Sequence, residues 1–156
     1  MKPNLIVEPV VKFNPFIPIG KLFIMMWKGK LLIKNKDKEK WEKYKNMQSG
    51  KEAINHEMYH IKQAVSTYNN WILYYIFYVW EYIKNLPIIF GFEFPYRFNA
   101  FELEAYANQH KKVTISNWKY YKKYTLKEKR KLWKQYKNMK KQHYISFSTY
   151  AKRYIK

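Results

Sequence analysis

The sequence predicts an α+β fold that is mainly helical, with a short β-hairpin or small sheet and a basic helical extension at the C-terminus. Two short apolar runs flank a turn at Gly29, a pattern typical of a hairpin. Apolar residues then recur at helical spacing from Ile54 to Val65, which favours an amphipathic helix. An aromatic run follows from Trp71 to Phe90. The 156 residues fit one domain and are enough to bury a core.

The N-terminal part is expected to lead into the hairpin. Glu8, Lys12 and several prolines break up the first apolar run, so it is expected to form an extended, turning segment and no signal peptide is recognised. KLFIMMW and LLIKN, joined by KGK, form the predicted hairpin. The lysine-rich stretch 34–50 is either a loop or an exposed helix around three apolar residues, Trp41, Tyr44 and Met47.

The next element is an amphipathic helix. Ser49 is expected to cap it, because Glu52 follows three residues later in the pattern of a capping box. Its expected core-facing stripe is Ile54, Met58, Ile61 and Val65. The helix is expected to end at the two asparagines 69–70.

The aromatic run is expected to form a buried helix, with a helix at a membrane interface as the alternative. Glu81, Lys84 and Pro87 interrupt it, and the uninterrupted apolar stretch is well short of the roughly 20 residues that span a bilayer. A loop marked by Pro87, Gly91 and Pro95 should follow. The helix after this loop is expected to begin at Asn99, a good capping residue.

The C-terminal part is strongly basic. Residues 111–156 hold 16 Lys or Arg and one acid, a net charge of +15, out of +20 for the chain. A helix is expected over Leu126–Met139, opened by Thr125 with Glu128 three residues later. We therefore expect a domain over 1–110 and a basic helical extension over 111–156 that packs on it or flanks it. Three of its residues, Leu126, Trp133 and Tyr136, could share an inward face.

The motif with the clearest chemical meaning is His56-Glu57-x-x-His60. Two histidines four residues apart on a helix project together and can bind one metal ion, while the intervening glutamate can act as general base. The chain has no cysteine, which excludes disulfides and zinc fingers and leaves histidines and carboxylates as zinc ligands.

A catalytic zinc site of this type needs a third protein ligand. The helix after Asn99 offers Glu102 and Glu104, far enough along the chain for it to return to the histidines. Asn108 lies one turn after Glu104 and could orient a ligating histidine through its amide.

These motifs carry a resemblance. HEMYH followed by ELEAYANQ resembles the gluzincin branch of zinc metallopeptidases, and the stretch from about Phe13 to Gln109 is similar to small HExxH proteins of Bacteroidetes and their phages. The resemblance implies a minimal zincin-like fold with Zn²⁺ bound by His56, His60 and Glu104, and with Glu57 as general base. Glu102 is the reserve ligand, and Asn108 stands where the larger family often has an aspartate.

The resemblance also implies a residue that stabilises the oxyanion. The sequence does not choose among five candidates, which are Tyr106, His110, Tyr120, Tyr121 and His143.

The expected function is therefore that of a zinc-dependent peptidase acting on a peptide or protein, either in the cytoplasm of a bacterial host or associated with a phage. The first alternative is a phage- or nucleoid-associated polyanion-binding protein with a structural or inactive zinc site. The second is a peripheral membrane protein. Both alternatives depend on the lysine-rich segment 111–156, which is expected to attract nucleic acid or anionic lipid weakly and in a salt-dependent manner.

Overall fold

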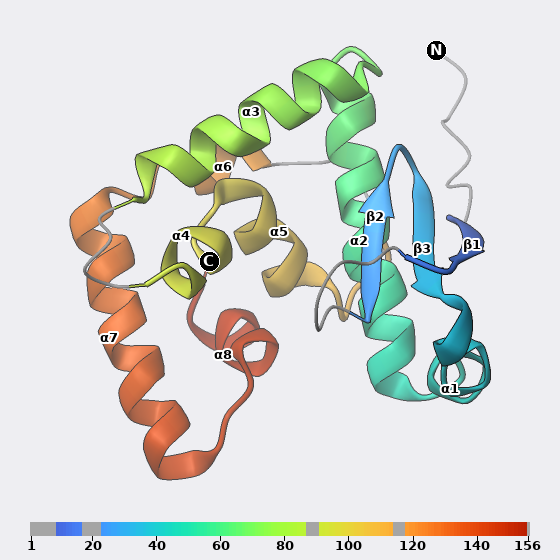
Figure 1. Ribbon diagram of the computed structural model, residues 1–156. Helices are drawn as coiled ribbons and strands as arrows, with labels where there is room; N and C mark the ends of the chain where they lie inside the picture. Colours follow the sequence, from blue (N-terminus) through green and yellow to red (C-terminus); the bar gives the residue numbers. More distant parts are fainter. Residues whose placement is uncertain (1–8, 17–22, 87–90, 114–117, 156) are drawn as a thin grey trace.

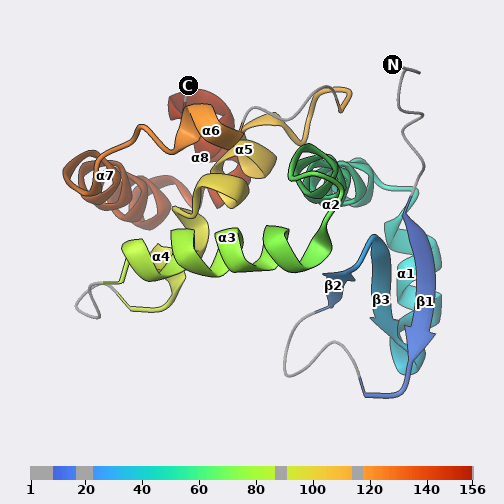
Figure 2. The same cartoon turned by 90° about the horizontal axis from the view of Figure 1, so that it is seen from above.

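The computed structural model describes residues 9–16, 23–86, 91–113 and 118–155. It confirms an α+β fold that is mainly helical. The small sheet lies on one side of the molecule with α1 and α2, and α4 to α8 gather on the opposite side (Figures 1 and 2). α3 runs from the end of α2 across to that side. The expected loop at Pro87 and the start of the N-terminal segment lie outside the described residues.

The sheet confirms the hairpin and adds a third strand. β2 (Ile24–Trp27) and β3 (Lys30–Lys34) are antiparallel. Lys28 and Gly29 between them both have positive φ, 47° and 76°, which suits the tight turn of a two-residue hairpin. β1 (Val10–Asn14), from the segment expected to be merely extended, pairs in parallel with β3. β2 is thus an outer strand of the described sheet.

The lysine-rich stretch after the sheet is helical. A 3-10 turn, η1 (Asn35–Asp37), leads into α1 (Lys38–Tyr44). The indole of Trp41 is buried and packs against Leu31 and Ile33 of β3. Apolar burial of this one side chain therefore fixes an otherwise charged helix on the sheet.

The amphipathic helix begins slightly earlier than the sequence predicts. α2 (Gln48–Ser66) is preceded by Met47 and has no side-chain cap, so the capping role expected of Ser49 is wrong. Gly50 lies so close to α1 that an added Cβ would be 1.9 Å from the backbone oxygen of Tyr44. The absence of a side chain at this position allows the close approach of the two helices.

The buried face of α2 also differs from the predicted stripe. The residues of α2 that are buried are Gly50, His56, Tyr59, His60, Gln63 and Ala64. Ile54, Met58, Ile61 and Val65 are only partly buried. The helix turns its histidines inward because α5 packs against that face and supplies polar partners, as described below.

The aromatic helix is buried on one face only. α3 (Trp71–Lys84) is capped by the side chain of Asn70, which accepts hydrogen bonds from the backbone N–H of Ile72 and Leu73. Tyr74 and Glu81 are buried, whereas its outer face is exposed. Among the described residues, no helix has both the length and the apolar character needed to cross a membrane.

A short helix and a buried helix follow. α4 (Glu93–Arg97) includes Pro95, where the sequence had indicated a loop. α5 (Ala100–Asn108) begins after Asn99, whose side chain accepts from the N–H of Phe101, so the predicted cap is confirmed. Most of α5 is buried, which explains why both of its glutamates need partners.

The basic C-terminal segment packs on α4 and α5. It forms α6 (Trp118–Tyr121), α7 (Leu126–His143) and α8 (Phe147–Tyr154). The capping box predicted for α7 is present. The aromatic side chains of Trp133 and Tyr136 are buried in one core with residues of α4, α5 and α8, while most lysines of α7 remain exposed. Aromatic packing and solvated lysines therefore coexist on this helix.

Candidate metal centre

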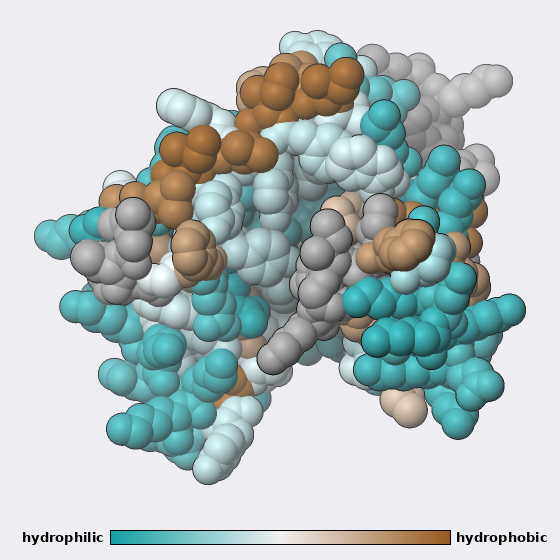
Figure 3. Space-filling view, in the orientation of Figure 1, coloured by the Kyte–Doolittle hydropathy of each residue, from teal (hydrophilic) through white to brown (hydrophobic). Residues whose placement is uncertain are grey.

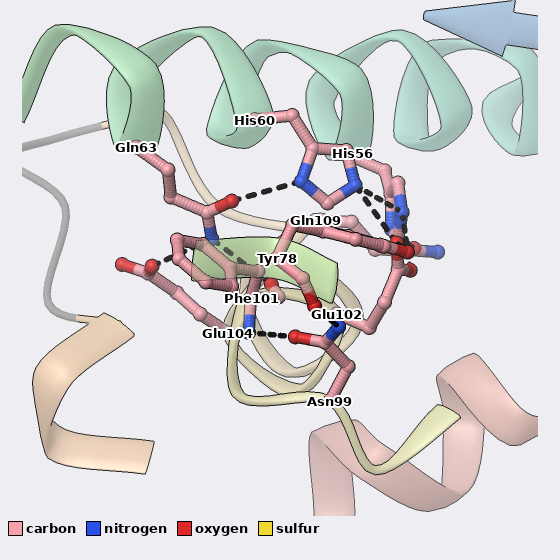
Figure 4. Close-up of polar contacts among 9 residues, drawn as sticks. All are labelled: His56, His60, Gln63, Tyr78, Asn99, Phe101, Glu102, Glu104 and Gln109. Atoms are coloured by element: carbon pink, nitrogen blue, oxygen red, sulfur yellow. Dashed lines mark hydrogen bonds and ion pairs between the residues drawn. The ribbon is translucent and has the colours of Figure 1, made fainter. Parts of the chain in front are cut away.

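Two helices supply the centre. His56 and His60 lie one turn apart on the buried face of α2, and Glu102 lies on α5, which packs against that face. Their side chains meet between the two helices (Figure 4). All three residues are buried, with exposed fractions of 6%, 5% and 2%.

The potential ligand atoms converge. The Nε2 atoms of His56 and His60 are 3.2 Å apart. The Glu102 carboxylate has Oε2 at 3.2 Å from the Nε2 of His56 and Oε1 at 3.3 Å from the Nε2 of His60. One ligand atom from each residue falls within 4.8 Å of the others, so this group could hold a metal ion.

Gln63 determines which nitrogen of His60 is available. The Nε2 of Gln63 donates to the backbone oxygen of Phe101 at 2.9 Å and to Oε2 of Glu104 at 2.8 Å. Its Oε1 therefore faces His60 Nδ1, at 2.8 Å, as the acceptor. Because Nδ1 carries a hydrogen, Nε2 is left with its lone pair toward the centre.

His56 has a similar but looser arrangement. Its Nδ1 lies 3.3 Å from Oε1 of Gln109, at the end of α5. The Nε2 of Gln109 donates in turn to Oε2 of Glu52 at 3.5 Å. The Nδ1 of each histidine thus contacts a glutamine, and that glutamine donates to a glutamate. These two chains of hydrogen bonds orient both imidazole rings. Sequence reasoning missed both glutamines.

The environment of Glu102 favours a bound cation. Its Oε1 accepts a hydrogen bond of 2.7 Å from the hydroxyl of Tyr78, whereas its Oε2 is buried without a hydrogen bond. The two oxygens of this buried carboxylate each face an imidazole nitrogen, and such an arrangement is costly unless a positive charge lies among them. The donor set therefore fits a metal ion.

Without a metal, protonation of His60 supplies that charge. Burial lowers the pKa of His60, but the adjacent Glu102 carboxylate outweighs burial and raises that pKa to about 9. Burial likewise raises the pKa of Glu102, but His60 and His56 outweigh it and hold that pKa well below its usual range. A metal ion and the His60 proton are consequently alternative ways to balance the same carboxylate.

The glutamate that lies beside the histidines is not the one preferred from the sequence. The structure places Glu102, the reserve candidate, beside the histidines, while Glu104 accepts from Gln63. Residues two apart on a helix differ by about 200° in direction, so the two carboxylates cannot face the same point. Glu104 contributes indirectly, by holding the amide that orients His60.

The positioning role predicted for Asn108 is also not observed. Its Nδ2 donates to the backbone oxygen of Glu104 at 2.9 Å and to the hydroxyl of Tyr121 at 3.0 Å. Asn108 follows Glu104 by one turn, so the rotation that turns Glu104 away from the histidines also turns Asn108 away. Gln63 and Gln109 take the place expected for it.

Glu57 lies at the boundary of two cavities beside the centre. The larger, of about 530 Å³, is also lined by His60, Glu102 and residues of β2 and α3. The smaller, of about 300 Å³, is also lined by His56. Burial raises the pKa of the Glu57 carboxyl, while His60 and His56 oppose this rise. A carboxyl group with a raised pKa beside the ligand cluster is suited to accept and return a proton.

Of the five oxyanion candidates, Tyr106 is the one on the wall of a described cavity beside the centre. Its ring centroid lies 4.4 Å from that of His56. Tyr96, which sequence reasoning missed, lines both cavities and hydrogen-bonds Tyr106. Tyr121 is instead engaged with Asn108. The remaining candidates, His110, Tyr120 and His143, line neither cavity.

Comparisons of the whole chain with protein-family models, with curated proteins and with solved structures gave no match. The functional argument therefore depends on the geometry of the centre.

Proposed function

We propose that the protein is a zinc-dependent peptidase. The observation that carries the proposal is the convergence of two imidazole nitrogens and a buried carboxylate, with the carboxyl group of Glu57 on the wall of the adjoining cavity. A buried structural site would need neither a cavity at the ligands nor a further acidic group facing it.

Zinc is the metal that this donor set suits best. Two histidines and one carboxylate, with no thiolate in the chain, match the three protein ligands of catalytic zinc sites. A zinc ion bound here would act as a Lewis acid and would lower the pKa of water to about 7.

The other residues have distinct roles in the proposal. Glu57 takes a proton from the attacking water and returns it to the leaving amine. Tyr78 holds the carboxylate of Glu102 through its hydroxyl. Tyr96 and Tyr106 carry the hydroxyl groups that could donate to the oxyanion, because both line the cavity that Glu57 and His56 share.

The larger cavity indicates the kind of substrate. Its walls are largely apolar and aromatic, formed by Trp27 and the methionines of β2, and by Tyr74, Tyr75 and Tyr78 of α3. β2 is an outer strand, so an extended peptide could pair along it. We infer that the peptidase prefers a large apolar or aromatic side chain next to the cleaved bond.

The substitution Glu57→Gln tests the proposal. It preserves the size of the side chain and leaves the ligand cluster intact, so the variant should bind as much zinc as the wild type. Hydrolysis of a mixed peptide library should fall by about 10²- to 10⁴-fold, the usual contribution of a general base.

Glu39→Gln on α1 is the matched control, because it makes the same change away from both cavities. It should keep full activity. Equal activity of wild type and Glu57→Gln would refute the proposed mechanism, and so would a zinc-loaded wild type that cleaves no peptide in the library.

A further inference from the structure

The outer face of α3 carries an exposed apolar stripe. It comprises Ile72, Ile76, Val79, Trp80 and Ile83, with Leu86 just after the helix. Their exposed fractions run from 69% at Ile72 to 40% at Leu86. Figure 3 shows brown side chains in a band along α3 at the upper edge of the molecule. This stripe follows the helical spacing that normally faces a core.

The polarity of α3 is inverted relative to a helix at a water-exposed surface. Its buried side carries the hydroxyls of Tyr74 and Tyr78 and the carboxylate of Glu81, with Tyr78 bonded to Glu102 of the metal centre. Its exposed side carries aliphatic groups and an indole. Rotation of the helix to bury the stripe would break the contact with Glu102, so α3 cannot remove its apolar face from water while the centre is intact.

Lysines lie near both ends of α3. Lys28, in the turn between β2 and β3, donates its backbone N–H to Tyr75 near the start of α3, at 2.9 Å. Lys84 is exposed at the end of α3, where Lys84 and Lys122 of the neighbouring segment both form ion pairs with Glu81, at 2.5 Å and 3.5 Å. Glu81 is the one acidic residue of α3 and is 1% exposed. The exposed face of α3 therefore presents no negative charge.

We propose that the exposed stripe of α3 binds the surface of an anionic lipid bilayer. A helix with aliphatic groups and a tryptophan on one face, and lysines beside it, has the composition of helices that lie in the membrane interface. The net charge of +20 attracts the whole molecule to such a surface. The same charge opposes a dimer over this face, because it would bring the flanking lysines of two copies together.

The stripe and the larger cavity are opposite sides of the same helix, since Tyr74, Tyr75 and Tyr78 of α3 line that cavity. Binding through the stripe would hold the metal centre close to the lipid headgroups. Membrane binding does not depend on the metal or on peptidase activity, because none of the stripe residues belongs to the ligand cluster.

Vesicle flotation with the full-length protein tests the proposal. Wild type should float with phosphatidylcholine vesicles that contain phosphatidylglycerol, and much less with phosphatidylcholine alone. The triple variant Ile76→Ser/Trp80→Ser/Ile83→Ser should lose about tenfold or more of its partitioning. The control variant Phe16→Ser/Met47→Ser/Tyr144→Ser changes three exposed apolar residues outside α3 and should partition like the wild type.

A second measurement does not depend on a triple substitution. Lipids brominated in their acyl chains should quench tryptophan fluorescence of the wild type, and Trp80→Phe should lose most of that quenching while still floating. The proposal is overturned if the triple variant, folded by circular dichroism, floats as well as the wild type, since lysines alone would then account for binding. The proposal is also overturned if the wild type does not float. If the wild type then forms dimers that the triple variant loses, the stripe is a contact between two copies of the chain.

Discussion

The pH dependence of metal affinity provides a quantitative test of the centre. The perturbation is a change of pH on the metal-free protein, in which Glu102 raises the pKa of His60 to about 9. At about pH 7, roughly 99% of molecules would then carry a proton on His60, and a metal ion must displace it. Zinc affinity should rise about tenfold per pH unit from about pH 7 up to about pH 9. This rise corresponds to about 2.7 kcal/mol in the free energy of zinc binding.

Isothermal titration of zinc in buffers that differ in ionisation enthalpy measures this effect. About one proton should be released from His60 per zinc bound at neutral pH. Glu102→Gln removes the largest influence that raises the pKa of His60, and burial, which lowers that pKa, remains. The proton release should therefore be much smaller, even though zinc binds more weakly. A wild-type affinity that does not change between neutral pH and pH 9 would refute the coupling between His60 and Glu102.

Two further predictions concern the same pair of helices. Gln63→Met removes the acceptor that orients His60 and the donor to Glu104. Zinc affinity should therefore fall about 10- to 100-fold. An unchanged affinity in a zinc titration would contradict the orienting role of Gln63. The metal-free protein should lose stability as pH rises: the folded-state pKa of His60 lies above its ordinary value of 6.5, so its stabilisation is full below pH 6.5 and declines above it. Between pH 6.5 and 8 the loss should be about 2 kcal/mol in urea unfolding. It should be much smaller in Glu102→Gln, which is the control for other titrating groups.

The histidine pair could be predicted from sequence because its geometry is local. A spacing of four residues on one helix brings two side chains together whatever the rest of the fold does, and the structure confirms that His56 and His60 converge. The Gln63 contact has the same local character, since Gln63 follows His60 by three residues. That spacing was a usable signal that the sequence analysis overlooked.

The choice between Glu102 and Glu104 depends on the rotation of α5, which no local pattern reports. Both residues are buried, and the helix is turned so that one meets the histidines and the other meets Gln63. The contact of Gln109 with His56 likewise spans 53 residues and depends on tertiary packing. The parallel pairing of β1 with β3 is also long-range and was missed for the same reason.

The surfaces of α2 and α3 show a related limit. Apolar periodicity on α2 predicted the stripe Ile54–Val65 as its core face, but polar partners on α5 draw the histidine face inward. On α3, the aliphatic periodicity indicates the side that carries Ile72, Ile76 and Ile83, but the structure leaves that side exposed. The hydroxyl of Tyr78 bonded to Glu102 marks the inner side.

Zinc content is the measurement that tests the central claim most directly. Elemental analysis should be made on wild type, Glu102→Gln and Glu104→Gln, each purified without chelators and dialysed against the same low zinc concentration. The two substitutions make the same isosteric change two residues apart on α5. We expect about one zinc per chain in wild type and in Glu104→Gln, and almost none in Glu102→Gln. Zinc retained by Glu102→Gln, or absent from the wild type, would contradict the proposed metal centre.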